Sequence, residues 1–256
     1  LKTLLLGQNQ LKTLPDQLPN LVQIDLSKNR FSHFPVVLNH LKELQSLNLS
    51  SNRLRQLPEL NFPALKSLLL STNKIVEGCF AAKGLPKLEK LDLAHNALTK
   101  FEFRGNFSTL QSLNLANNQL QTLPDAWKLL PFLRQLDLSN NQLEHLPISL
   151  GTCVWLKTLL LNKNKLVLKD RYFSTFQRLE ELHLADNALN QVPDLPATLR
   201  KIDLARNQFT RIPAALFQIP NLRQLDLSYN PLSSLKGVEQ AIQLSQLGLR
   251  GVPLAN

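Results

Sequence analysis

Residues 133–143 read LRQLDLSNNQL, and residues 222–232 repeat the same frame as LRQLDLSYNPL. Leucines recur at shared positions in both copies, and an asparagine follows the third leucine at a fixed distance. This asparagine returns at intervals of 20 to 23 residues, at Asn9, Asn29, Asn52, Asn73, Asn96, Asn118, Asn141, Asn164, Asn187, Asn207 and Asn230. A twelfth copy, residues 244–254, carries Val252 instead. Self-similarity at a constant period predicts a solenoid of stacked coils.

The spacing within each copy predicts one strand followed by one turn. Leucine alternates with polar residues around Asp137, which is typical of a half-buried strand with Leu136 and Leu138 inward. One coil cannot bury its own leucines, so stacked coils must share a core and align their strands as a parallel sheet. The asparagine amide offers donors and an acceptor, and we expect it to satisfy buried backbone groups in the turn.

The return segments between strands vary. Proline follows an apolar residue in several of them and prevents the strand from continuing, at Pro15, Pro35, Pro58, Pro124, Pro147, Pro193 and Pro213. A 23-residue copy leaves room for a 3₁₀ turn or a short helix, whereas the 20-residue copy containing residues 192–199 leaves room only for an extended return. Residues 75–88 and 98–110 depart from this rule, and we expect local features of the convex face there.

The two cysteines, Cys79 and Cys153, lie about three coils apart. Neighbouring coils are about 5 Å apart, and this separation argues against a disulfide between them. We therefore expect both to be free, small, buried hydrophobic residues, which favours a reducing compartment. No stretch approaches the roughly 20 apolar residues of a membrane span.

The frame L-x-x-L-x-L-x-x-N-x-L over about residues 1–254 resembles the leucine-rich-repeat family. The resemblance implies an α/β solenoid, a curved horseshoe with a parallel β-sheet on the concave face. Short 3₁₀, helical or extended returns would form the convex face. It also implies a single domain, residues 1–256, of about 12 coils that grips a partner protein.

The mixture of 20- and 23-residue copies is similar to cytoplasmic members of the family, including bacterial effectors delivered into the host cytoplasm. Leu1 is already in repeat phase and no initiator methionine is present, so we expect a fragment of a longer chain. Because no end cap is visible, flanking segments or self-association are expected to cover the ends.

The solvent-facing strand positions are the candidate contact surface. The central position of the strand holds acids, amides and three leucines, Leu5, Leu69 and Leu160, which have no folding reason to be exposed there. Isolated exposed leucines are also common on ordinary surfaces. The predicted partner-binding residues are Leu69, Asp137, Leu160, His183, Arg200, Asp203, Arg223, Asp226, Tyr229 and Arg250.

The charge of +10 is concentrated on the strands and the turns that follow them. This favours a protein partner with an acidic surface, although lysine and arginine also serve simply to keep repeat surfaces soluble. Few aromatic residues occupy the strand positions and acids are interspersed among the bases, which argues against a nucleic-acid partner.

No catalytic or metal-binding constellation is recognisable, and the sequence predicts neither an enzyme nor a cofactor. The five histidines are scattered, and His183 with Asp186 has no nucleophile beside it. The aspartates at the central strand position recur because the repeat frame recurs. The alternative function left open is a substrate-recognition arm of a larger enzyme or signalling protein whose catalytic domain lies outside this sequence.

Overall fold

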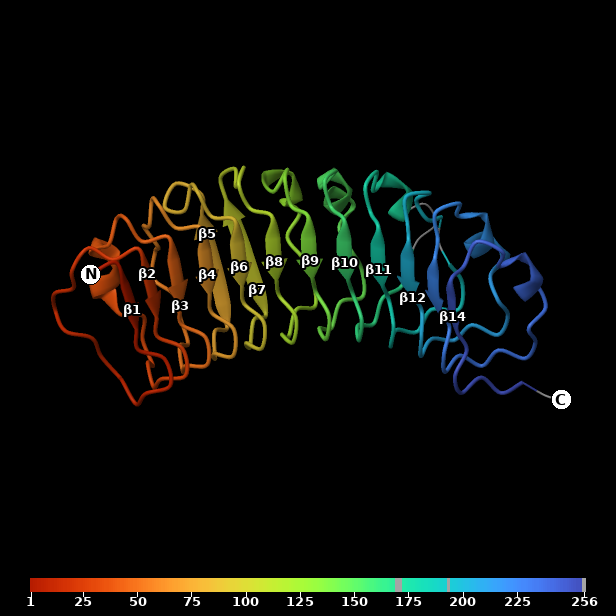
Figure 1. Ribbon diagram of the computed structural model, residues 1–256, viewed down its shortest axis with the longest axis horizontal. Helices are drawn as coiled ribbons and strands as arrows, with labels where there is room; N and C mark the ends of the chain where they lie inside the picture. The colour runs from red at the N-terminus through yellow and green to blue at the C-terminus, as the bar shows by residue number, and fades with distance from the viewer. Residues whose placement is uncertain (169–171, 193, 255–256) are drawn as a thin grey trace.

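The chain winds into a curved solenoid of parallel strands (Figure 1). The structure is a computed structural model that describes residues 1–168, 172–192 and 194–254. Every copy of the motif contributes one strand to a continuous parallel sheet, so the predicted fold is confirmed. In spatial order its strands are β1 (Thr3–Leu5), β2 (Gln23–Asp25), β3 (Ser46–Asn48), β4 (Ser67–Leu69), β6 (Lys90–Asp92), β8 (Ser112–Asn114), β9 (Gln135–Asp137), β10 (Thr158–Leu160), β11 (Glu181–His183), β12 (Lys201–Asp203), β13 (Gln224–Asp226) and β14 (Gln246–Gly248).

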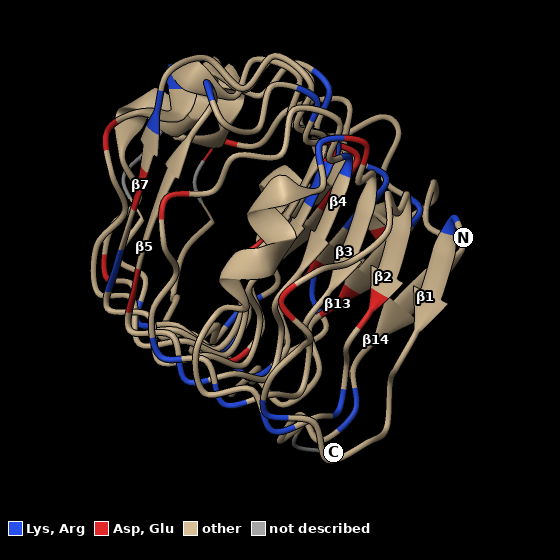
Figure 2. Cartoon of the chain, turned by 90° about the vertical axis from the view of Figure 1, so that its left-hand side faces the viewer, with Lys and Arg blue, Asp and Glu red and all other residues tan. Residues whose placement is uncertain are grey.

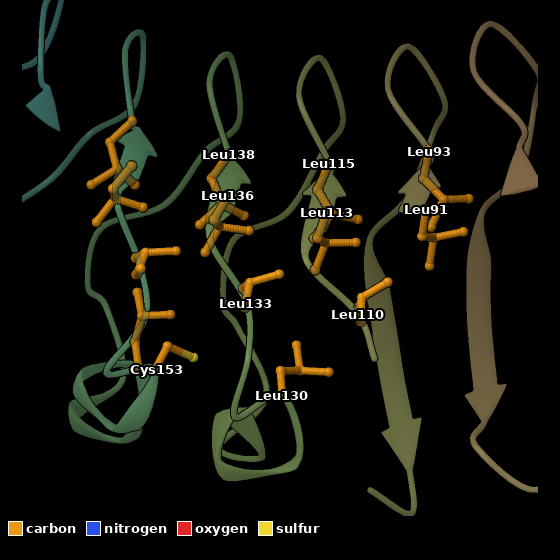
Figure 3. Packing of buried hydrophobic residues seen from close by; sticks show 14 of the residues in the cluster. Leu91, Leu93, Leu110, Leu113, Leu115, Leu130, Leu133, Leu136, Leu138 and Cys153 are labelled. Carbon is orange, nitrogen blue, oxygen red and sulfur yellow. The ribbon is translucent and has the colours of Figure 1, made fainter. Parts of the chain in front are cut away.

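The core is a stack of leucines placed by the strand register. Leu136 of β9 pairs with Leu113 of β8 and with Leu159 of β10, so the same side chain recurs at the same height in successive coils. These leucines are almost completely buried, and Figure 3 shows them pointing into the interior in parallel rows. The neighbouring polar residues of each strand consequently face outward, because strand side chains alternate.

The return segments follow the predicted dependence on length. The described helical segments are all 3₁₀ and lie in copies of 22 or 23 residues, whereas the 20-residue copies return without helix. Pro35, Pro147 and Pro213 each precede a 3₁₀ helix with extended backbone, while Pro193 lies outside the described residues. The 3₁₀ helices are η1 (Val36–His40), η2 (Trp127–Leu129), η3 (Ile148–Thr152), η4 (Phe173–Thr175), η5 (Ala214–Gln218) and η6 (Val238–Gln240).

The two irregular returns form a second sheet. Strands β5 (Glu77–Ala81) and β7 (Lys100–Arg104) pair in parallel on the side opposite the main sheet (Figure 2). Phe80, Phe101 and Phe103 point into the core from these strands. The intervening Cys79 points outward and is exposed, so the prediction that both cysteines are buried is wrong for Cys79. Cys153 is buried and free as expected, and burial raises its pKa to about 12.

The repeated asparagines join neighbouring coils. In Asn141, Nδ2 donates to the carbonyl oxygens of Leu138 in its own coil and Leu115 in the preceding coil, both at 3.0 Å. Its Oδ1 accepts the backbone N–H of Leu120, also at 3.0 Å and also from the preceding coil. The same pattern recurs at Asn118 and Asn164, which confirms the structural role predicted for this position.

Candidate functional site

The strand face comprises the outward side chains of the main sheet, the residue just before each strand and the turn that follows it. Five predicted contact residues form one row on it, because the register pairs Asp137 with Leu160, Leu160 with His183, His183 with Asp203, and Asp203 with Asp226. Leu69 occupies the same position on β4, but β6 and β8 separate it from this row. The structure therefore gathers five of the ten predicted contact residues in one row on β9–β13 and leaves Leu69 apart.

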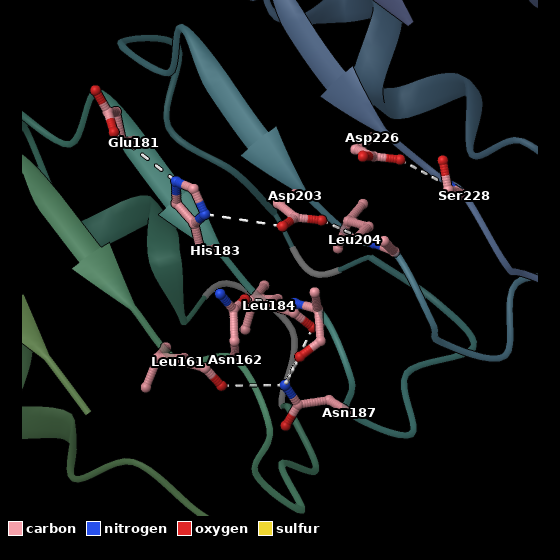
Figure 4. A network of polar contacts seen from close by, with 12 residues as sticks. Leu161, Asn162, Glu181, His183, Leu184, Asn187, Asp203, Leu204, Asp226 and Ser228 are labelled. Carbon is pink, nitrogen blue, oxygen red and sulfur yellow. Dashed lines mark hydrogen bonds and ion pairs between the residues drawn. The ribbon is translucent and has the colours of Figure 1, made fainter. Parts of the chain in front are cut away.

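The aspartates of this row also hold the turns. One carboxylate oxygen of Asp137 accepts the backbone N–H of Ser139 at 2.9 Å, and Asp203 and Asp226 make the same bond two residues ahead. Figure 4 shows this bond between Asp226 and Ser228. Such a local bond is typical of aspartate at the start of a turn. Their recurrence thus has a folding cause that the sequence interpretation missed.

The leucines of the central position differ in exposure. Leu5 is 67% exposed, as expected, whereas Leu69 and Leu160 are half-buried among their neighbours. A half-buried leucine already has much of its surface covered by the adjacent strands. Leu160 and Leu69 therefore offer less apolar contact surface than their sequence position suggested.

His183 lies in the middle of the row with little of its side chain exposed. Its Nδ1 is 3.8 Å from Asp203 Oδ2 and its Nε2 is 3.8 Å from Glu181 Oε2 (Figure 4). Burial lowers the pKa of His183, and the charge of Lys201 lowers it further. The two carboxylates act in the opposite direction but are outweighed. His183 is consequently neutral near pH 7.

We expect His183 to make the fold sensitive to mild acid. Its folded pKa lies below 6.5, so the unfolded chain takes up this proton more readily and stability falls as pH drops below that value. The substitution His183→Gln should remove the loss of folding stability that protonation of His183 causes. Urea unfolding at neutral and mildly acidic pH measures this difference. His33→Gln, at an exposed histidine, is the control. Identical pH dependence in His183→Gln and the parent would contradict the assignment.

Bases flank the row on both edges of the sheet. Arg200 and Arg223 precede β12 and β13 and are adjacent, since the Arg223 backbone N–H donates to the Arg200 carbonyl at 2.8 Å. Glu180 accepts a hydrogen bond from Lys157 at 2.8 Å and lies 4.0 Å from Arg200. The hydrogen bond from Lys157 lowers the pKa of Glu180 and keeps it ionised. One carboxylate therefore faces two cations, which leaves this edge positive.

Tyr229 and Arg250 lie at the opposite edge, in the turns that follow β13 and β14. The Tyr229 backbone N–H donates to the Arg250 carbonyl at 2.7 Å, so the two predicted residues are neighbours. The guanidinium of Arg206 stacks over the Tyr229 ring at 4.2 Å. Tyr229 and Arg250 are therefore separated from Arg200 and Arg223 by the width of the sheet.

The sequence interpretation missed an aromatic cluster at the edge of the sheet that carries Arg200 and Arg223. Phe132 and Trp155 lie 6.4 Å apart between their ring centroids, and the Arg178 guanidinium lies 3.7 Å from the Trp155 ring. These residues directly precede the first leucine of three successive copies. Comparison of the residue before the first leucine in every copy is the sequence signal that identifies this cluster.

Within residues 1–168, 172–192 and 194–254, no group of histidine, cysteine, aspartate and glutamate is arranged to hold a metal ion. Over the same ranges, no helix has the length and apolar character needed to cross a membrane.

The fold and its open strand face define a class of protein, the curved repeat solenoid that presents a parallel sheet to its surroundings. The chain belongs to the leucine-rich-repeat family. A family model described as "Leucine rich repeat" matches residues 1–54, 100–143 and 197–253, which together are more than half of the chain. A second model described as "Leucine Rich repeat" matches residues 84–100.

Several known proteins are similar to the chain. Leucine-rich repeat serine/threonine-protein kinase 1 of Mus musculus is 31% identical over 97% of this chain and 10% of its own length. Adenylate cyclase of Schizosaccharomyces pombe is 30% identical over 92% of this chain and 16% of its own length. Podocan of Mus musculus is 32% identical over 85% of this chain and 38% of its own length. The chain therefore spans only a minor part of each of these relatives.

Solved structures show the same architecture. An LRR protein of Leptospira interrogans superposes with a TM-score of 0.86 and 30% identity, covering 98% of this chain and 67% of that one. The structure of the complex of FLRT2 (LRR), Latrophilin 3 and Unc5D gives a TM-score of 0.80 and 26% identity. The match covers 96% of this chain and 80% of that one.

Proposed function

We propose that this chain binds a partner protein along the strand face of β9–β14. Leucine-rich-repeat domains are protein–protein interaction modules, and the FLRT2 structure is a complex with other proteins. The observation that carries the proposal is the continuous row from Asp137 to Asp226 with unburied bases at both edges. The six strands β9–β14, about 4.8 Å apart, span roughly 24 Å of the sheet, which suits a macromolecule better than a small molecule.

The charge of the surface indicates the chemistry of the partner. Turn bonds occupy one oxygen of Asp137, Asp203 and Asp226, and the nearby bases Arg200 and Arg223 remain exposed. An acidic protein surface would complement this edge and be steered toward it. An effector role in a host cytoplasm and self-association through the ends both stay predictions. The relatives do not point to one role, because they range from a protein kinase to Podocan.

A second candidate function is the recognition arm of a larger enzyme. Two relatives carry catalytic names, the protein kinase and the adenylate cyclase, and the chain covers only 10% and 16% of them. Reading the complete open reading frame that contains this sequence tests the candidate directly. A neighbouring catalytic domain would support it, and an uninterrupted repeat array from start to stop would contradict it.

Reversing charge on the strand face is expected to weaken partner binding at least about tenfold. The test variant combines Arg200→Glu, Arg223→Glu and Arg250→Glu, because like charges placed against an acidic partner repel it. Binding is measured by quantitative affinity capture and then with the purified partner.

The matched control reverses three exposed bases of the return segments, Lys42→Glu, Lys83→Glu and Lys128→Glu. Both variants change the net charge equally, so non-specific electrostatics should affect them alike. Equal binding by the two variants, with both folded by circular dichroism, would remove the support for this surface.

A further inference from the structure

An exposed apolar patch marks one edge of the solenoid, at the residues just before the motif leucines. The aromatic edge consists of Phe132, Val154, Trp155 and Arg178. Phe132 is 45% exposed and Val154 is 40% exposed, while Trp155 is half-buried. The patch lies between the 3₁₀ helices η2–η4 and strands β9–β11, near the middle of the solenoid (Figure 1).

The fold does not require aromatic side chains at this position. In the other copies from the second onward the residue before the first motif leucine is small or polar, namely Asn20, Glu43, Ala64, Lys87, Thr109, Thr198, Asn221 and Gln243. Phe132 and Trp155 occupy it in two adjacent copies and contact each other. Exposed aromatic clusters of this kind are typical of interaction sites, where tryptophan and arginine often contribute most of the binding energy.

A positively charged hollow adjoins the aromatic edge. It has a volume of about 250 Å³ and is lined by Lys157, Arg178, Arg200 and Glu180, together with polar side chains. Three cations thus face one carboxylate. Arg178 belongs to both features, because its guanidinium stacks on Trp155 and also lines the hollow. The surface therefore places apolar contact area directly beside uncompensated positive charge.

This combination fits an acidic protein segment better than a nucleic-acid strand. Aromatic platforms for single strands leave ring faces open for bases, but Arg178 covers one face of Trp155. A peptide can instead place one apolar side chain against Phe132 and Trp155 and direct carboxylates at the cations.

We propose that the aromatic edge and its hollow dock an acidic peptide segment of the partner through one apolar anchor residue. The anchor side chain packs on Phe132, Val154 and Trp155, and flanking carboxylates pair with Lys157, Arg178 and Arg200. This proposal rests on the proposed function and names the part of the surface that contributes most to binding.

The test selects peptides from a library of random dodecapeptides displayed on phage, with the whole chain as bait. Enriched peptides are expected to combine aspartate or glutamate with one aromatic or large aliphatic residue. Enriched peptides that contain no tryptophan are synthesised and titrated against the chain, with the tryptophan fluorescence of the chain as the readout. Trp127 is only 1% exposed, so the change in emission reports on Trp155.

The variant Arg178→Glu should weaken these peptides at least about tenfold. Lys87→Glu is the matched control, since it makes the same charge reversal at the same position of another copy. Phe132→Ser tests the anchor contact separately, with titration calorimetry for affinity and circular dichroism for folding. Should Phe132→Ser fail to fold, Phe132→Leu replaces it and is expected to weaken binding to a smaller extent.

Four outcomes would overturn the proposal. Peptides that lack the acidic and apolar combination, or that bind Arg178→Glu as well as Lys87→Glu, would show that the aromatic edge is not the docking site. If Arg250→Glu instead abolishes the binding of those peptides, the proposed function is supported and this inference is wrong. If no peptide is enriched at all, this inference fails, while the proposed function is decided separately by the charge-reversal variants and the partner protein. Binding of dodecathymidylate that depends on Arg178, without peptide binding, would assign the surface to nucleic acid.

Discussion

The substitution Asn141→Asp is expected to lower the free energy of unfolding by about 4 kcal/mol. The Asn141 side chain is 8% exposed, and its amide donates to the carbonyls of Leu115 and Leu138 while its oxygen accepts from Leu120. Aspartate would place an acceptor against two carbonyl oxygens and bury a charge. Each buried polar group left without a partner costs about 1–3 kcal/mol, which sets the size of the effect.

Urea unfolding followed by circular dichroism measures this loss. The control is Asn140→Asp, which makes the same chemical change at the exposed neighbouring residue. Asn140 has a φ of 53°, a left-handed conformation that aspartate also tolerates. Asn140→Asp also removes an exposed hydrogen bond from Asn140 Nδ2 to Asn117 Oδ1, so we expect the control to lower stability by about 1 kcal/mol or less. Equal losses in the two variants would refute the proposed role of the asparagine rows.

The second large effect is expected at Gly84, which lies in the return after β5. A Cβ atom at Gly84 would fall 1.9 Å from the carbonyl oxygen of Leu60 in the preceding coil. The Gly84 carbonyl accepts the Phe62 backbone N–H at 2.8 Å, so the two backbones are held together at this point. Gly84→Ala must push them apart and break that bond. A loss of about 3 kcal/mol is expected, at the upper end of the range for overpacking that shifts the backbone.

Lys83→Ala is the control for this substitution, since it introduces the same residue at the exposed neighbouring position. Thermal unfolding should show a clear drop for Gly84→Ala and little change for Lys83→Ala. A Gly84→Ala protein as stable as the parent would mean that the returns around Leu60 and Gly84 are less closely packed than described.

Sequence periodicity was sufficient for the parts of the fold that each copy decides locally. The leucine and asparagine positions predicted the place of every strand in the main sheet, because alternation determines which side chains face inward. The lengths of the copies predicted which returns have room for a 3₁₀ helix. The row of contact candidates on β9–β13 followed from the same frame, since parallel coils in register place equivalent residues side by side.

Features that depend on contacts between particular neighbouring coils needed the tertiary structure. The pairing of β5 with β7 exposes Cys79, because alternation along an unforeseen strand turns it outward. Stacking of Phe132, Trp155 and Arg178 requires the coil-to-coil spacing that the core sets. By itself the sequence determined the coil and its order of stacking. Only the packed structure decided which side chains of adjacent coils meet, because those contacts depend on distances across the stack and not on spacing along the chain.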